Sequence, residues 1–221
     1  MAETGTRTVE RALTLLVAVA EDGGTLSQLA RAAALSPSTA SRLLATLAGQ
    51  ELVRRDEHGH YRPGPRLRQL AAVTLRSDSV YELAGPYLAA LARETGETAN
   101  LAVAADDRRV VYLRQVAGPK LVQTASWAGR TIPRRGTALG AALRGAVGDH
   151  GYVARAGAVE PDVTSIAAPV YDADGDIAAA LSVLAPSYRM SALRIETCGR
   201  AVAHHAAGLS RDLGASVPVA A

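Results

Sequence analysis

A short segment near the N-terminus groups side chains that can contact the edges of DNA bases. Its polar side chains are Ser38, Thr39, Ser41, Arg42 and Thr46. Short hydroxyl side chains allow a helix to lie deep in the major groove, and a guanidinium can bond two acceptors of a guanine or a phosphate. An ordinary amphipathic helix with a solvated polar face would show the same residues, so the neighbouring elements must decide between the two interpretations.

The sequence predicts a capped helix that carries this polar face. Ser36 is a typical N-cap residue, and Pro37 suits the first turn because its missing amide would have no partner there. The helix is predicted to end near Gly49. Its buried face is predicted to consist of Ala40, Leu43, Leu44 and Leu47.

Two helices are predicted before it. Residues 8–22 carry apolar side chains three and four positions apart, which predicts a helix that ends at Gly23-Gly24. The apolar face of that helix is Val9, Ala12, Leu13, Leu16 and Ala20. Thr25 and Gln28 match a capping box, in which two side chains accept hydrogen bonds from free amides at a helix start. A second helix is therefore predicted to about Ala34.

A basic hairpin is predicted after these helices. Residues 52–56 and 60–62 have the pattern of short strands, joined by a turn at residues 57–59. Its basic side chains are Arg54, Arg55, His58, His60 and Arg62. Positive side chains on a hairpin suit contacts with phosphates, although a solvated hairpin would look similar.

Helix, helix, tight turn, capped helix and hairpin, in that order, predict a winged helix-turn-helix whose third helix enters the major groove of double-stranded DNA. Arg7 and Arg11, near the chain start, are candidates for phosphate contacts or for plain surface charge. The predicted DNA-contacting residues are Arg7, Ser36, Ser38, Thr39, Ser41, Arg42, Arg54, Arg55, His60 and Arg62.

The rest of the chain predicts an antiparallel sheet bracketed by helices, so the fold class is α+β. A connecting helix is predicted over residues 66–76, with a domain boundary near Ser77. The further predicted helices are residues 80–95, 137–143 and a long terminal helix with Ile195, Cys198, Val202, Leu209 and Leu213 on its apolar stripe. The predicted strands are residues 100–104, 109–115, 166–171 and 177–184, with 121–125 extending the sheet and 129–136 irregular.

Composition argues against several classes of protein. Cys198 is the only cysteine, so an internal disulfide and a thiolate metal cluster are excluded. No apolar run approaches the roughly 18 residues of a membrane-spanning helix, so we expect a soluble cytoplasmic protein without a membrane partner. No spaced carboxylate pair, metal-ligand cluster or phosphate loop stands out, so no enzyme, metal or cofactor is expected. Lys120 is the only lysine among 24 basic residues, which suits phosphate binding or reflects a GC-rich genome.

Several motifs resemble the IclR family of bacterial transcriptional regulators, the isocitrate-lyase-regulator type. In the first half the similar segments are TVERAL at 8–13, LSPSTASRLL at 35–44 and YRPGPR at 61–66. In the second half they are IP at 132–133, GTALG at 136–140, SIAAPVYD at 165–172 and ALSV at 180–183. The resemblance covers nearly the whole chain, from Thr8 to about Gly214.

This resemblance implies a winged helix-turn-helix, a linker helix and a GAF-like sensor domain, assembled as a homodimer or homotetramer. Members of the family usually repress transcription and sometimes activate it. The implied domains are residues 1–65 for DNA binding, 66–77 for the linker helix, 78–214 for effector binding and oligomerisation, and 215–221 for a flexible tail. Binding of an effector is expected to shift the linker helices, so that the spacing of the recognition helices no longer fits the operator.

The family binds small organic acids or aromatic compounds between the sheet and the short helix. The matching positions are Ala138, Leu139, Val163, Ser165, Ser182 and Leu184. Trp127, the only tryptophan, is a candidate either for the core or for the ligand site near Arg130.

The chain departs from the family pattern in two ways. Leu184 stands where the family commonly has a second serine, which favours a larger or more apolar ligand than a small acid. The passage between Leu143 and Ile166 is shorter than usual and rich in Gly and Ala. The pocket is therefore open, or closed by a partner subunit, or sensing has been lost. The alternative to an effector-controlled regulator is thus a constitutive DNA-binding regulator with a vestigial sensor domain.

Overall fold

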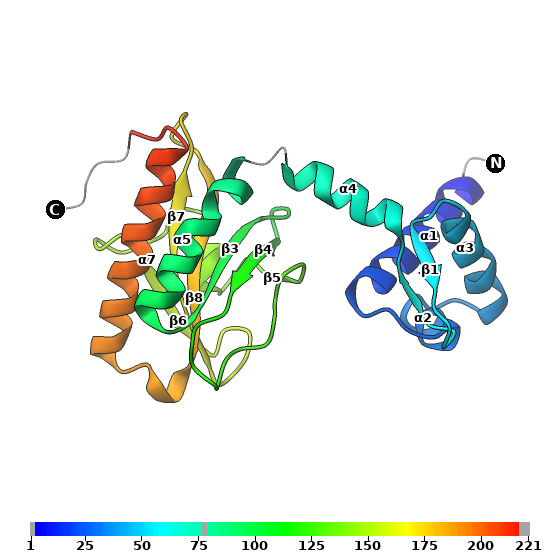
Figure 1. The fold of residues 1–221 in the computed structure, drawn as a ribbon, viewed down its shortest axis with the longest axis horizontal. Coiled ribbons are helices and arrows are strands. Elements are labelled where there is room, and N and C mark those ends of the chain that lie inside the picture. Colours follow the sequence, from blue (N-terminus) through cyan, green and yellow to red (C-terminus); the bar gives the residue numbers. More distant parts are fainter. Residues whose placement is uncertain (1–2, 77–78, 217–221) are drawn as a thin grey trace. The chain divides into compact units, whose positions relative to one another are not determined.

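The computed structural model describes residues 3–76 and 79–216 (Figure 1). Its contacts divide the chain into two compact units, Met1–Ser77 and Asp78–Ala221. The predicted boundary at Ser77 and residues 217–221 of the predicted tail lie outside the described residues. Each unit has a hydrophobic core of its own.

The first unit has the predicted order of three helices, a hairpin and a fourth helix. Its helices are α1 (Glu3–Glu21), α2 (Leu26–Ala32), α3 (Pro37–Gly49) and α4 (Pro65–Arg76), and its strands are β1 (Val53–Arg55) and β2 (Tyr61–Pro63). Both predicted helix caps are present. The Thr25 hydroxyl accepts a hydrogen bond from the Gln28 amide at 3.4 Å, and the Gln28 side chain accepts one from the Thr25 amide at 2.8 Å. The Ser36 hydroxyl accepts one from the Thr39 amide at 3.3 Å.

Hydrogen bonds fix the hairpin of β1 and β2 against the turn between α1 and α2. The amide of Gly24 donates to the Tyr61 carbonyl at 3.2 Å, and the amide of Tyr61 donates to the Gly24 carbonyl at 2.7 Å. Tyr61 is buried in the same core as the apolar face of α3. The hairpin is therefore held beside α3, as a wing requires.

The predicted apolar face of α1 coincides only in part with its core face, against which Ala12 and Leu16 pack. Leu15 and Val19 are buried, with 0% and 1% of their surface exposed. Val9, Leu13 and Val17 are exposed at 58%, 54% and 54%. Both faces are apolar, so periodicity could not show which of them meets the rest of this unit.

The second unit is an antiparallel sheet with helices on both faces. Its helices are α5 (Ser79–Thr95), α6 (Ala138–Ala142) and α7 (Ala192–Asp212). Its strands are β3 (Thr98–Ala104), β4 (Arg109–Val116), β5 (Thr131–Pro133), β6 (Val153–Ala156), β7 (Val163–Tyr171) and β8 (Ile177–Pro186). The strand order is β5-β4-β3-β8-β7-β6, with every neighbouring pair antiparallel. A short 3-10 helix, Ser187–Arg189, follows β8.

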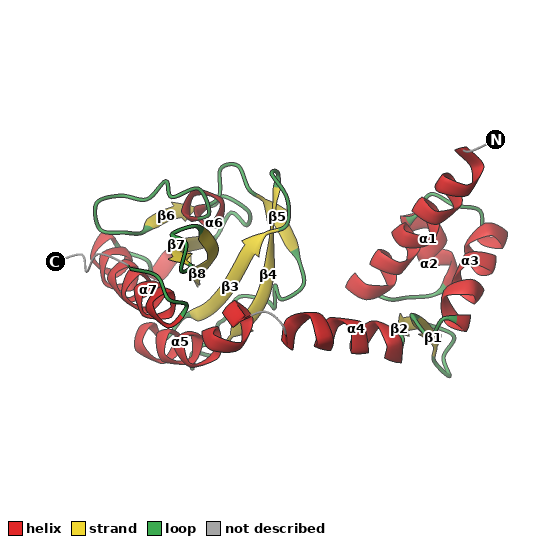
Figure 2. Ribbon diagram, turned by 90° about the horizontal axis from the view of Figure 1, so that it is seen from above, coloured by secondary structure: helices red, strands yellow, loops and turns green. Residues whose placement is uncertain are grey.

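The two faces of this sheet pack into separate hydrophobic cores. Helices α5 and α7 lie together on one face, and α6 lies on the other (Figure 2). Residues alternate along β8, so that Leu181 and Val183 contact the α5 and α7 side while Ala180 and Leu184 contact the α6 side. Cys198 is a buried member of the core beneath α7, as its place on the apolar stripe predicted.

Two predictions for this sheet were wrong. Residues 121–125 do not extend it, and Leu121 is fully exposed. The edge strand is β5, inside the segment that was expected to be irregular, where Ile132 pairs with Val110 and is 4% exposed. Strand β6 was also missed, because the passage that contains it is rich in Gly and Ala and shows little alternation. No helix in residues 3–76 or 79–216 is long and apolar enough to cross a membrane.

Candidate nucleic-acid interface and ligand cavity

The polar face of α3 is exposed in the first unit. Ser36, Ser38, Ser41, Arg42 and Thr46 are exposed, and Thr39 is half-buried. Hydrogen bonds join the hydroxyls at the helix start, since the Ser36 Oγ donates to the Thr39 Oγ1 at 2.9 Å and lies 3.1 Å from the Ser38 Oγ. Within the described residues, the Arg42 side chain has no ion pair, so its guanidinium donors are available to another molecule.

The wing is organised around one carboxylate. Asp56 accepts hydrogen bonds from the backbone amides of His60 at 2.8 Å and His58 at 3.1 Å, and from the Arg62 Nε at 3.5 Å. The amide of His60 makes the largest contribution to holding the pKa of Asp56 below its usual value. The turn therefore keeps an ionised carboxylate beneath its basic side chains.

The arginines of the wing do not all point the same way. Arg54 lies directly opposite Arg62 across the hairpin, so these two point from one face. Arg55 lies opposite Tyr61, with its guanidinium 5.9 Å from the ring centroid and its Nε donating to the Gly59 carbonyl. Arg54 and Arg62 therefore share one face of the wing, whereas Arg55, which is also exposed, lies on the face that carries Tyr61.

Arg7 and His60 complete the predicted set of DNA contacts. Arg7 is an exposed residue of α1. His60 is half-buried, and its Nδ1 lies 3.8 Å from the Asp56 carboxylate. The His60 backbone amide therefore helps to order the turn, and its half-buried side chain remains partly exposed there.

The second unit contains a cavity between the sheet and α6. Of the predicted ligand contacts, Ala138, Leu139, Val163, Ser165, Leu184 and Trp127 line it. The lining residues that sequence reasoning missed are Tyr112, Ile132, Thr137, Arg155, Ala158, Val159 and Glu160. Ile132 and Thr137 belong to segments that resembled the family motifs, which was the available signal for them. The cavity volume is about 30 Å³.

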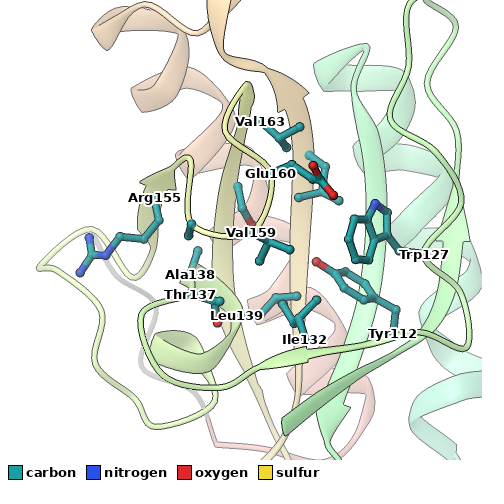
Figure 3. A pocket seen from close by; sticks show the side chains of 13 residues that line it. Tyr112, Trp127, Ile132, Thr137, Ala138, Leu139, Arg155, Val159, Glu160 and Val163 are labelled. Atoms are coloured by element: carbon teal, nitrogen blue, oxygen red, sulfur yellow. The ribbon is translucent and has the colours of Figure 1, made fainter.

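Two aromatic side chains form one side of this cavity. The rings of Tyr112 and Trp127 lie with their centroids 5.8 Å apart, and Figure 3 shows them beside each other. The amide of Trp127 donates to the Gln115 Oε1 at 2.9 Å, which fixes the position of that residue. Burial raises the pKa of the Tyr112 phenol, which stays neutral and able to donate a hydrogen bond.

The shortened passage after α6 supplies another wall of the cavity. Its residues Arg155, Ala158, Val159 and Glu160 all line the space. Figure 3 shows the Arg155 side chain extending away from the other labelled side chains, and its guanidinium donates to the Ala154 carbonyl. The shortened passage therefore supplies a cavity wall from within the same chain, where its length had left an open pocket as one alternative.

Three buried polar atoms lie on the cavity face of the sheet without a hydrogen-bond partner among the described residues. They are the Asn100 Oδ1, the Ser165 Oγ and the Ser182 Oγ. Ser182 lies opposite Asn100, and Ser165 lies opposite Leu184. Ser182 is two residues from the cavity-lining Leu184, so all three side chains share one face. Ser182 itself is fully buried beneath the cavity and does not line it.

A winged helix-turn-helix joined to an α+β unit with an internal cavity defines a two-domain transcription regulator that binds DNA. Residues 8–57 match the family profile described as the IclR helix-turn-helix domain, and residues 72–149 and 146–211 match the one described as bacterial transcriptional regulator IclR C-terminal. The chain belongs to the IclR family, which consists of transcriptional regulators and not of enzymes.

Known proteins support this assignment. The HTH-type transcriptional regulator BhcR of Paracoccus denitrificans is 27% identical over 93% of this chain and 87% of its own. The transcriptional repressor IclR of Escherichia coli is 32% identical over 62% of this chain and 52% of its own. The fold matches an IclR homolog from Microbacterium hydrocarbonoxydans, solved in complex with 4-hydroxybenzoate, with a TM-score of 0.74, 23% identity and coverage of 93% of this chain and 98% of that one.

Proposed function

We propose that this protein is a cytoplasmic, sequence-specific repressor whose operator affinity changes when a small organic effector occupies the cavity of the second unit. The observation that carries the DNA-binding part is the exposed face of α3, with an unpaired arginine and four exposed hydroxyls beside a basic wing. The repressor direction is supported by the name of the Escherichia coli relative. The interface residues are those predicted from the sequence.

The chemistry of the cavity favours an aromatic effector with a polar group. Tyr112, Trp127 and Ser165 line the cavity and offer two ring surfaces and a hydroxyl that lacks a partner among the described residues. Ser182 and Asn100 lie on the same face of the sheet but do not line the cavity, so an effector reaches their polar atoms only when a wall moves. A buried polar atom without a partner costs free energy that a ligand or an ordered water recovers. The complex of a relative with 4-hydroxybenzoate supports the same ligand class.

The size of the cavity sets a condition on binding. A volume of about 30 Å³ is room for little more than a water molecule. An aromatic effector therefore requires a wall to move, and the exposed segment at residues 157–160 is the candidate. The small volume also supports the alternative of a constitutive regulator with a vestigial sensor, which the titration below distinguishes.

Replacing Ser182 with alanine is expected to weaken effector binding by roughly tenfold, because a hydrogen bond between a buried hydroxyl and a charged group contributes about 1.5–3 kcal/mol. Trp127 is the only tryptophan and lines the cavity, so its fluorescence reports occupancy directly. The titration uses 4-hydroxybenzoate first and then other aromatic carboxylates. Ser79→Ala, an exposed position at the start of α5, is the matched control. Equal affinities for the two variants would remove Ser182 from the site, and no response to any compound would favour the vestigial sensor.

We also propose that the protein binds DNA as a homo-oligomer built on dimers. An apolar stripe of Val9, Leu13 and Val17 is exposed on α1, and Leu70 and Val73 are exposed at 52% and 65% on α4. Neighbouring large apolar residues exposed along a helix indicate a surface that another molecule covers. A dimer would place two α3 helices about 34 Å apart, at half-sites one turn of DNA from each other.

A Leu13→Asp variant is expected to weaken dimerisation by roughly tenfold or more, because it places a charge in an apolar contact. Thr14→Asp introduces the same charge at the next, exposed position and is the matched control. Sedimentation velocity over a concentration series measures both dissociation constants. Unchanged dimerisation in Leu13→Asp would show that the α1 stripe is not the interface.

The overall proposal is tested by binding to DNA upstream of the protein's own gene, compared with a random fragment across a salt series. Specific binding that falls steeply with salt would support a regulator that neutralises several phosphates. Addition of an effector identified by the Trp127 titration should then change operator affinity. Binding that stays equal for both fragments under every condition, including with DNA selected from the whole genome, would contradict sequence-specific regulation.

A further inference from the structure

A second concave site lies in the same unit as the cavity but shares no lining residue with it. Its volume is about 500 Å³, and it is lined by Asp107, Arg108, Pro133, Arg134, Arg135 and Arg144. The arginines come from the turn between β3 and β4, from the segment directly after β5 and from the segment after α6. With four arginines against one aspartate, this arginine groove carries a strong positive charge.

The positive charge of the arginine groove is not neutralised within the described residues. None of its four arginines lies within ion-pair distance of a carboxylate there, whereas the neighbouring Arg109 is paired with Asp106 at 2.7 Å. Arg108, Arg135 and Arg144 are exposed. The Nε of Arg134 is buried and has no hydrogen-bond partner among those residues. Clustered like charges repel one another, so the arrangement favours an anion that joins them.

Contacts with backbone carbonyls hold two of the four guanidinium groups, those of Arg134 and Arg144, in place before any ligand binds. The Arg134 guanidinium donates to the Leu143 carbonyl at 2.9 Å, and the Arg144 guanidinium donates to the Arg134 carbonyl at 3.4 Å. The amide of Arg134 also donates to the Arg108 carbonyl at 2.7 Å. A Cβ at Gly140 would overlap the Arg134 carbonyl oxygen, so α6 packs directly on this backbone. The floor of the site is thus preorganised by Arg134 and Arg144, while the exposed side chains of Arg108 and Arg135 are free to turn toward a ligand.

We propose that the arginine groove binds a small anion that carries at least two phosphate charges, and that this site is separate from the effector cavity. Guanidinium groups fork onto phosphate oxygens, and charge-assisted hydrogen bonds of this kind are the strong class. The volume of about 500 Å³ lies within the range of small-molecule sites and suits a ligand of nucleotide size. A concave site with arginines from three segments favours such a compact anion over an extended nucleic-acid backbone.

The test titrates inorganic pyrophosphate into the full-length protein by calorimetry, at low and at moderate salt. Wild-type protein should bind pyrophosphate more tightly than inorganic phosphate. The double variant R108A/R135A removes two groove charges whose side chains make no hydrogen bond or ion pair within the described residues. It should lower the affinity for pyrophosphate by roughly tenfold or more, because charge-assisted bonds are lost.

A matched control separates this site from general attraction to a basic protein. R93A/R200A removes two arginines from α5 and α7, away from the groove, and should leave the affinity within about twofold, since distant exposed charges are screened. Equal losses in both double variants, or no pyrophosphate binding to the wild type, would overturn the proposal. Loss of affinity for random DNA without pyrophosphate binding would assign the groove to the DNA backbone and would also overturn it.

Discussion

The Arg42→Ala variant is expected to lose sequence preference for its operator while it remains folded. Arg42 is exposed on α3, between the buried Ala40 and Leu43, so its side chain can be shortened without a cavity in the core. A bidentate contact from an arginine to a guanine contributes about 1–3 kcal/mol of discrimination, so the ratio of specific to random binding should fall by roughly five- to 150-fold.

The control for this experiment is Arg54→Ala on the exposed face of the wing. A phosphate contact carries no sequence information, so this change should weaken binding to operator and random DNA alike and reduce the salt slope by about 1. Fluorescence anisotropy with both DNA fragments across a salt series separates the two patterns. If Arg42→Ala keeps the preference of the wild type, then α3 does not read the operator through that side chain.

Elements fixed by local chemistry were predicted well from the sequence. The caps at Thr25 and Ser36 depend on hydrogen bonds between residues three positions apart, and such patterns are visible in any sequence. The hairpin of β7 and β8 was likewise marked by its turn, where Asp172 accepts hydrogen bonds from the amides of Asp174 and Asp176. In these places the local signal and the folded structure agree.

Elements fixed by distant contacts were not predictable. Strand β5 has only three residues, and its pairing with β4 decides its conformation. Residues 121–125 contain apolar side chains but pair with no strand. On α1, two apolar faces compete and only packing against α3 selects Leu15 and Val19.

The residues of the ligand cavity also divide into those that a sequence pattern marked and those that only distant contacts bring together. The cavity residues Ala138, Leu139 and Ser165 lie in segments that resemble the family motifs, which is why the sequence placed them among the expected ligand contacts. Tyr112 and the wall at residues 158–160 are brought to the cavity by the sheet register and by a loop, which no spacing rule reveals. The direction of Arg55 depends on its pairing with Tyr61 across the hairpin, which became visible only in the structure.

Control of DNA binding by the cavity requires that an effector prefers one of two states of the protein. A coupling free energy of about 1–3 kcal/mol changes operator affinity by roughly five- to 150-fold. The nearly closed cavity is the state with unsatisfied Ser165, Ser182 and Asn100, and an effector that bonds these atoms would stabilise a more open state. The gain in hydrogen bonds is thus the source of the differential affinity that the proposal needs.

A buried ion-pair network makes Glu97 a charged residue of the second unit whose replacement should cost substantial stability. The Glu97 carboxylate is fully buried, with the Lys120 Nζ at 2.5 Å and the Arg189 Nη2 at 2.6 Å. The carboxylate joins the start of β3 to the segment after β4 and to the 3-10 helix after β8. Its hydrogen bonds to Arg189 are the largest cause of the raised pKa of that guanidinium.

Glu97→Gln is expected to destabilise the second unit by about 3 kcal/mol, the lower end of the range for breaking a buried ion pair, because the partly exposed Lys120 regains some hydration. Glu94→Gln, which removes the charge of the half-exposed carboxylate beside His205 but keeps an acceptor oxygen, should cost less than about 1 kcal/mol. Urea unfolding followed by Trp127 fluorescence reports on this unit alone, since the first unit has no tryptophan. Equal midpoints for the two variants would show that the Glu97 pairs only offset the cost of burying their charges.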